Sequence, residues 1–104
     1  MTSSAYYYDL DLERGVLALH GELGDPASSD LRGTIIKATG ELTSDLAIDL
    51  ADVTLLPSLA IGVLASTKAG ARRHGATITF VAPPGSVAAR MLTICALDYV
   101  DALA

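Results

Sequence analysis

The sequence has few cysteine and basic residues, and each shortage excludes a class of protein. Its 104 residues include one cysteine, Cys95, so an internal disulfide is impossible and we expect a reducing, cytoplasmic setting. Seven Lys and Arg residues against twelve Asp and Glu give a formal net charge of −5. The basic residues form no patch along the chain, which argues against a nucleic-acid partner.

Long hydrophobic runs are also missing. The apolar stretches are too short and too interrupted to span a bilayer, so we expect no direct membrane insertion. Residues 1–6 lack the positive charge and following apolar run of a signal peptide. What is present is 51 % hydrophobic and 18 % charged residues, typical of a compact globular chain. We therefore expect one domain over residues 1–104.

The N-terminal region has the pattern of a β-hairpin. Apolar and polar residues alternate from Tyr6 to Leu12, which predicts a strand with one buried face. A turn at 13–15 and a second apolar run at 16–20 complete an antiparallel pair. The residues expected on the buried face are Tyr6, Tyr8, Leu10 and Leu12.

Beyond the hairpin, helices and strands alternate. Asp25 is expected to be an N-cap with Pro26 at the first helical position, and Gly40 ends that helix. There follow, in order, a strand at 46–50, a helix at 58–74, a strand at 77–81, a last helix marked by Val87, Met91 and Ile94, and a short ending at 99–103. This order predicts an α/β fold: a small mixed sheet with an antiparallel hairpin at one side and helices packed on the sheet.

The most informative stretch runs from Asp49 to Leu64: Asp-Leu-Ala-Asp-Val-Thr-Leu-Leu-Pro-Ser-Leu-Ala-Ile-Gly-Val-Leu. It resembles the signature of the STAS family, the anti-sigma-factor antagonists, in which a strand and loop run into Asp-Ser-Ser/Thr-Gly-Leu-Gly-Val-Leu. Shorter matches lie at 21–23, 74–76 and 93–97 in the family's order. The resemblance extends over nearly the whole chain and implies the STAS fold, here without the family's C-terminal helix.

Aligned with that signature, the family's phosphorylated serine falls on Ser58. The family's acids are missing: Pro57 stands before the serine, and Gly24 stands after Gly-Glu-Leu, with the acid displaced to Asp25. The resemblance thus implies that Ser58 is a degenerate phosphorylation site and a poor kinase substrate. It places the partner-binding surface on Gly24, Asp25, Pro57, Ser58, Leu59 and Ile61.

The local physics at Ser58 supports such a site. A residue before proline favours extended backbone, so Leu56 ends a strand or loop and the helix begins near Ser58. The hydroxyl is then expected to be exposed near unpaired backbone N–H groups, where the helix dipole stabilises a phosphate. The alternative is that Ser58 is only a structural N-cap.

The remaining candidates have simpler interpretations. His20 and His74 lie in no metal-ligand spacing, so His74 is expected to stabilise a helix end and His20 to be a partly exposed strand residue. Cys95 is expected to be a small buried residue. Asp9, Asp11, Glu13 and Asp52 are expected to form a solvated acidic surface. No Gly-x-Ser-x-Gly or phosphate-binding loop is present, so we expect no catalytic residue, metal or cofactor.

These observations predict a cytoplasmic, non-enzymatic protein that acts by binding another protein. The resemblance implies a bacterial transcription regulator whose partner is an anti-sigma factor of the histidine-kinase-like ATPase type, so that binding frees a sigma factor. Two alternatives stay open: a STAS subunit of a membrane transporter that binds its ATPase, and a small-ligand sensor. The residues indicate neither the identity of the partner nor an oligomeric state.

Overall fold

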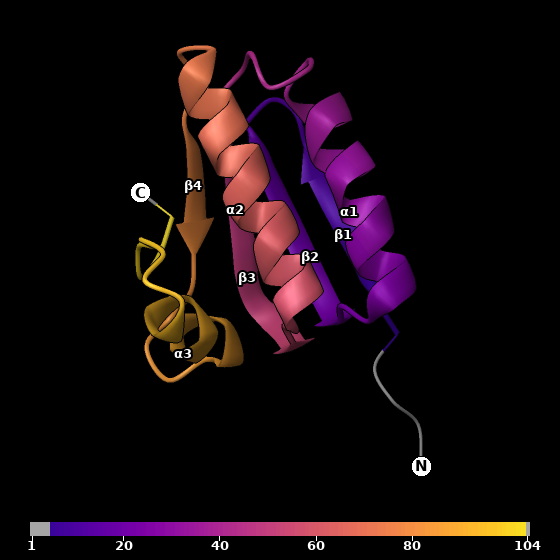
Figure 1. Ribbon diagram of the computed structural model, residues 1–104, viewed down its shortest axis with the longest axis vertical. Coiled ribbons are helices and arrows are strands. Elements are labelled where there is room, and N and C mark those ends of the chain that lie inside the picture. Colours follow the sequence, from indigo (N-terminus) through magenta and orange to yellow (C-terminus); the bar gives the residue numbers. More distant parts are fainter. Residues whose placement is uncertain (1–4, 104) are drawn as a thin grey trace.

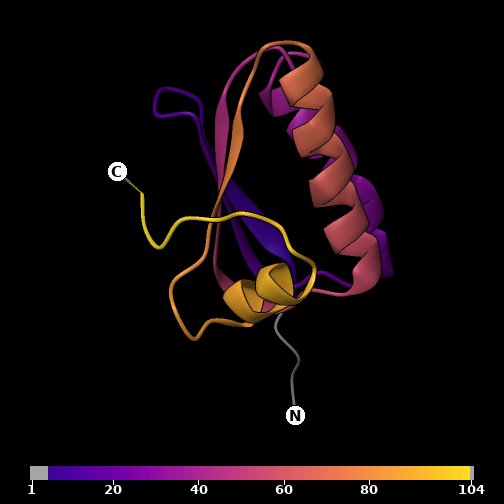
Figure 2. The ribbon, with the colours of Figure 1, turned by 60° about the vertical axis from the view of Figure 1, so that its left-hand side comes forward.

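The computed structural model describes residues 5–103, which form a sheet with two long helices on one face. The strands are β1 (Tyr7–Asp11), β2 (Val16–Glu22), β3 (Leu46–Leu55) and β4 (Ile78–Val81), and the helices are α1 (Asp25–Ala38), α2 (Ser58–Arg73) and α3 (Val87–Ile94). Helices α1 and α2 lie side by side in front of the strands (Figure 1). Turning the molecule shows both on the same side of the sheet, with α3 at the end where α2 begins (Figure 2).

The sheet topology is the one that the alternation of elements predicts. The strand order is β1-β2-β3-β4. Strands β1 and β2 are antiparallel, while β2 pairs with β3, and β3 with β4, in parallel. The chain is therefore a mixed α/β structure with an N-terminal hairpin at one side, and that prediction is confirmed.

The hydrophobic core comes from strands β2, β3 and β4 and from the inward faces of the helices. Parallel pairs covered by helices bury long apolar side chains, and the sheet contributes such residues on β2, β3 and β4. The fully buried large side chains include Leu17, Leu19, Leu31, Ile35, Ile48, Leu50, Leu64, Ile78, Phe80 and Leu92.

Strand β1 contributes nothing to this core, which corrects the sequence-based expectation of a buried face. All five of its residues are exposed, and Leu12 lies outside the strand with 69 % exposure. Tyr8 and Leu10 are 46 % and 37 % exposed. The alternating pattern predicted the strand correctly, but β1 lies at the outer side of the sheet, where the helices bury neither of its faces.

Strand β3 continues to Leu55 rather than ending at Leu50. The extension pairs with the end of β2, at His20↔Asp52, Gly21↔Val53 and Glu22↔Leu55. Asp52 interrupts the apolar run beyond Leu50, so the sequence alone predicts a shorter strand. The parallel neighbour supplies the backbone hydrogen bonds that extend it.

The helix ends differ from expectation by one residue. Gly24 is the N-cap of α1, so Asp25 is the first helical residue rather than the cap. Helix α2 ends at Arg73, and Gly75 follows with a φ of 81°. The Nδ1 atom of His74 lies 2.8 Å from the Gly70 carbonyl oxygen, which supports the predicted role of His74 in stabilising this helix end.

Helix α3 forms as predicted but turns a different face inward. Val87 and Ile94, which marked the helix, are 42 % and 70 % exposed, whereas Ala88 and Leu92 are fully buried. Cys95 is exposed, so the expectation that it is buried is wrong. A short helix at the end of the sheet buries one narrow face, and Cys95 lies past its last turn.

The short ending after α3 makes a single pairing with the sheet. Val100 forms one parallel bridge with Val81. The Val100 N–H donates to the Phe80 oxygen at 2.9 Å, and the Ala82 N–H donates to the Val100 oxygen at 2.9 Å. Among residues 5–103, no helix is long and apolar enough to cross a membrane.

Candidate functional site

The starts of α1 and α2 meet at one end of the sheet. Because β2 and β3 are parallel, their carboxyl ends lie at the same edge, and each leads into a helix. The Leu23 N–H donates to the Leu55 oxygen at 3.1 Å and joins the two connections. The structure therefore brings the Gly24-Asp25 turn beside the Pro57-Ser58 turn. We call Gly24, Asp25, Leu55, Pro57, Ser58 and Leu59 the helix-start surface.

Ser58 is exposed and is the first residue of α2. Pro57, with extended backbone angles, is the N-cap, and no side chain caps the helix. The first helical bond runs from the Ile61 N–H to the Pro57 oxygen at 3.0 Å, so the three preceding N–H groups have no acceptor within the helix. The expected exposure of Ser58 at the helix start is confirmed, and the interpretation of Ser58 as the N-cap is wrong, because Pro57 holds that position.

Two exposed leucines flank Ser58. Leu55 at the end of β3 is 46 % exposed and Leu59 in the first turn of α2 is 48 % exposed. Ile61, which the sequence also placed on this surface, is only 8 % exposed and belongs to the core. A helix turns about 100° per residue, so Ile61 shares the inward face with Leu64 and cannot be a principal surface contact.

Gly62, three residues after Leu59, has no side chain, so the backbone of α2 is accessible at this point of the helix surface. It is exposed in the helix, and a Cβ atom built there would meet no other atom within 4 Å. Glycine inside a helix costs about 1 kcal/mol relative to alanine. Packing within this chain gives no reason for that cost, whereas close approach of another molecule would.

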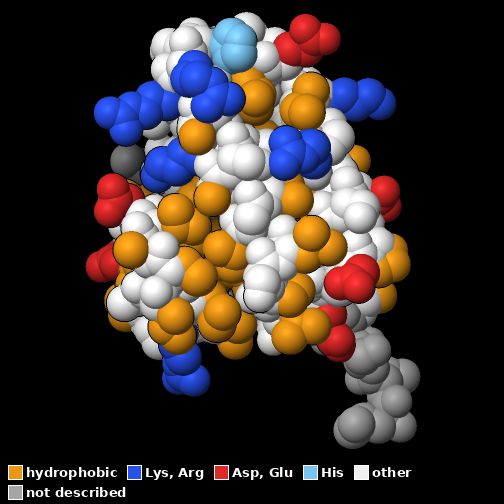
Figure 3. Space-filling model, viewed as in Figure 1, with side chains coloured by type: hydrophobic (Ala, Val, Ile, Leu, Met, Phe, Trp, Pro, Cys, Tyr) orange, Lys and Arg blue, Asp and Glu red, His pale blue; other side chains and the backbone are white. Residues whose placement is uncertain are grey.

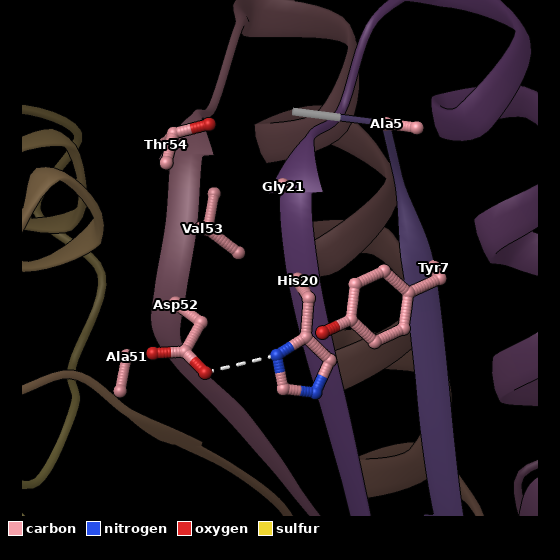
Figure 4. Close-up of a pocket in the computed structure, with 8 residues that line it drawn as sticks. All are labelled: Ala5, Tyr7, His20, Gly21, Ala51, Asp52, Val53 and Thr54. Atoms are coloured by element: carbon pink, nitrogen blue, oxygen red, sulfur yellow. Dashed lines mark hydrogen bonds and ion pairs between the residues drawn. The ribbon is translucent and has the colours of Figure 1, made fainter. Parts of the chain in front are cut away.

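The structure assembles a second cluster that sequence reasoning missed. The His20 Nδ1 atom lies 2.9 Å from Asp52 Oδ2, and Nε2 lies 3.1 Å from Asp9 Oδ2. The Tyr7 ring stacks on the imidazole with centroids 4.5 Å apart and planes 11° apart. Figure 4 shows Tyr7 and Asp52 on opposite sides of His20. Asp9 and Asp52 are thus partners of one histidine, not merely scattered solvated acids.

This cluster borders a shallow depression of about 430 Å³, lined by Ala5, Tyr7, His20, Gly21, Ala51, Asp52, Val53 and Thr54. Both imidazole nitrogens are occupied by carboxylates, so neither is available to activate a nucleophile. In the described part of the chain, no group of three His, Cys, Asp or Glu residues has a metal-binding arrangement. The cluster therefore links β1, β2 and β3.

Counting residues from the hairpin turn along both strands could have predicted the contact between Tyr7 and His20. Tyr7 and His20 are opposite each other in the antiparallel register. The contact with Asp52 was beyond sequence reasoning, because the strand carrying it was expected to end at Leu50. Irregular pairing between Ala18 and His20 also shifts the register there.

Among residues 5–103, Tyr6 is the one group with a clearly shifted pKa. Burial raises the pKa of the Tyr6 hydroxyl to about 12, with smaller contributions from Tyr8 and Asp30. Its oxygen is buried and has no hydrogen-bond partner among the described residues. A phenol in that position strongly favours its neutral form.

Comparison with known proteins identifies the family. A family model described as the Mlab, STAS domain matches residues 7–101. The fold is similar to that of an anti-sigma factor antagonist from Mycobacterium paratuberculosis, with a TM-score of 0.74 at 20 % identity over 97 % of this chain and 88 % of that one.

Two structures of the anti-sigma factor antagonist SpoIIAA are also similar. The unphosphorylated form has a TM-score of 0.66 at 16 % identity, over 95 % of this chain and 90 % of that one. The phosphorylated form, from Bacillus, has a TM-score of 0.64 at 16 % identity, over 88 % and 83 % of the two chains. With its matching family model and this shared fold, the chain belongs to the STAS domain family.

Proposed function

We propose that residues 1–104 form one non-enzymatic STAS domain that acts in the cytoplasm by binding another protein through the helix-start surface. The partner is an anti-sigma factor of the histidine-kinase-like ATPase type, and its sequestration frees a sigma factor for transcription. Family membership and the antagonist-like fold support this proposal.

The observation that carries the proposal is the exposure of Leu59 beside Ser58. Neighbouring apolar side chains left exposed on a surface mark a candidate protein-binding site, and a central anchor contributes more than about 1 kcal/mol to binding. Leu55 extends this apolar patch, and Gly62 lets a partner approach the helix backbone. The Gly24-Asp25 turn borders it from α1.

Phosphorylation of Ser58 would act on the same surface. A phosphate there would place nearly two negative charges between Leu55 and Leu59, at the positive end of the α2 dipole. The helix would tolerate that charge without refolding, whereas an apolar contact with a partner would be lost. Pro57 and Gly24 stand where the family has acids, so we propose that the cognate kinase modifies Ser58 poorly.

Affinity capture from the native cytoplasm, followed by mass spectrometry, tests this function. Wild-type bait should retain an ATPase-type anti-sigma factor, and Leu59→Ala and Ser58→Glu should each reduce its recovery severalfold. Leu12→Ala is the matched control, because Leu12 is 69 % exposed but lies at the hairpin turn. Equal recovery by all four proteins would show that the surface is wrong, and recovery of a transporter ATPase would favour a transporter subunit instead.

A further inference from the structure

A second hollow lies along the other half of α2, away from the helix-start surface. It has a volume of about 600 Å³ and is lined by Ala65, Lys68, Ala69, Arg72, Arg73 and Leu97. We call it the basic groove. The two alanines form its floor and Leu97, in the segment after α3, forms an apolar wall. Three cationic side chains make its rim.

The charge of this groove is opposite to that of the whole protein. The chain has a net charge of −5, yet three of its seven Lys and Arg residues line this hollow. Helix α2 contains no Asp or Glu. Figure 3 shows Lys and Arg side chains gathered at the upper end of the helical face, above a mostly uncharged surface over the lower half of α2.

Nothing within the described residues neutralises this rim. The ion pairs found in residues 5–103 are those of His20, and none involves Lys68, Arg72 or Arg73. Lys68 Nζ lies 4.9 Å from the Phe80 ring centroid, which holds the ammonium group beside the groove. The helix dipole accounts for Arg72 and Arg73 in the last turn, but not for Lys68 a turn earlier or for the apolar hollow.

We propose that the basic groove binds an acidic amphipathic helix of a partner protein. A helix laid in a groove contributes apolar side chains at spacings of three and four, which suits a floor of small residues beside Leu97. Its flanking carboxylates would pair with the arginines, whose planar groups bind carboxylates in two-point fashion. A concave, partly apolar site fits such a helix better than it fits a flat lipid surface.

This interaction is separate from the partner at the helix-start surface. Ala65 to Arg73 occupies the second half of α2, and no residue of the helix-start surface lines the groove. The two sites can therefore be tested with different variants of one protein.

The test uses a synthetic helical peptide of about 18 residues, long enough to form a helix in water. Its leucines are spaced three and four apart and flanked by glutamates, and a control peptide has lysine at every glutamate position. Titration into isotope-labelled protein is followed by NMR. The acidic peptide should shift the amide signals of residues 65–73 and Leu97, and the lysine peptide should not.

Charge reversal identifies the contacts. The double variant Arg72→Glu, Arg73→Glu should bind the acidic peptide at least about tenfold more weakly, because two charge-assisted contacts become repulsive. The control Arg14→Glu, Arg90→Glu changes the net charge equally outside the groove and should bind like wild type. Leu59→Ala should also bind like wild type.

Several results would overturn the proposal. These are no shift of groove signals at about 1 mM peptide, equal binding of both peptides, or equal loss in the two double variants. Vesicles containing phosphatidylglycerol provide the remaining arm. One outcome is that the protein binds these vesicles but not the peptide, and that the double variant Arg72→Glu, Arg73→Glu does not bind the vesicles. In that case the groove binds a membrane and the proposal is wrong.

Discussion

At the scale of single residues, burial decides which side chain has a shifted pKa. Tyr6 lies just before β1, where its hydroxyl is buried without a hydrogen-bond partner among the described residues. Tyr7, its neighbour, is 58 % exposed and stacks on His20. Adjacent tyrosines thus have different roles, because successive residues of an extended segment point to opposite sides.

The raised pKa of Tyr6 predicts a loss of stability at high pH. Its pKa in the folded protein, about 12, is above the ordinary value of 10.0, so the unfolded chain releases its proton first as the pH rises. Stability is therefore unaffected by this group below pH 10 and falls between about pH 10 and 12, where only the unfolded chain ionises readily. Urea unfolding of wild type and Tyr6→Phe across this range measures the effect.

The Tyr6→Phe protein should show a smaller decline, since the other three tyrosines are common to both proteins. It should also be at least as stable as wild type at neutral pH, because the substitution removes a buried hydroxyl with no partner. An identical alkaline decline in both proteins would contradict this assignment.

At the scale of elements, α1 and α2 are alike in carrying an exposed glycine in mid-helix. Gly33 in α1 and Gly62 in α2 each have open space where a Cβ atom would lie. Both therefore weaken their helices without easing any contact within the chain. Only Gly62 lies one turn beyond Leu59. Substitutions at the two glycines can therefore distinguish an effect on helix stability from an effect on partner binding.

Gly62→Ala should raise the free energy of unfolding by up to about 1 kcal/mol while weakening partner binding. Gly33→Ala should bring a similar gain in stability and leave binding unchanged. Chemical denaturation and calorimetric titration with the captured partner measure the two quantities. If Gly62→Ala bound the partner as tightly as wild type, the partner would not approach α2 at this point.

The start of α2 also predicts how Ser58 responds to a kinase. With Pro57 and Gly24 in place of the family's acids, incubation of the wild type with ATP and the cognate ATPase should add little phosphate, as read by intact-protein mass. The double variant Pro57→Asp, Gly24→Asp should gain one phosphate, and adding Ser58→Ala should abolish it. Efficient modification of the wild type at Ser58 would show that these acids are dispensable.

At the scale of the whole molecule, His20 joins three strands of the sheet. Its carboxylate partners come from β1 and β3 and are 76 % and 69 % exposed, so solvent screens both contacts. The edge strand has no helix-facing core residue, which makes this polar cluster an important side-chain link between β1 and the sheet.

Asp9→Ala and Asp52→Ala should each lower the free energy of unfolding by at most about 1 kcal/mol. Each should couple to His20→Ala in a double-mutant cycle, and the coupling should shrink in about 1 M salt, where charges are screened. Urea unfolding at two salt concentrations provides the values. A coupling of zero at low salt would mean that the cluster does not hold β1.

The amino-acid sequence by itself determined the order of elements and the start of α2. Hydrophobic spacing, turn residues and proline act over a few neighbouring positions, so they predict the hairpin, the alternation of strands and helices, and the exposed Ser58 at a helix start. These local signals also placed His74 at a helix end, whereas the family resemblance placed Leu59 at the surface.

Only the tertiary structure decided which residues meet and which are buried. Edge position left β1 exposed, and strand pairing extended β3 to Leu55 and brought Asp52 to His20. The inward face of α2 buried Ile61, whereas Cys95 was left in solvent past the last turn of α3. Such outcomes depend on partners that are distant in the sequence, 32 residues apart for His20 and Asp52. Local pattern carries no information about them.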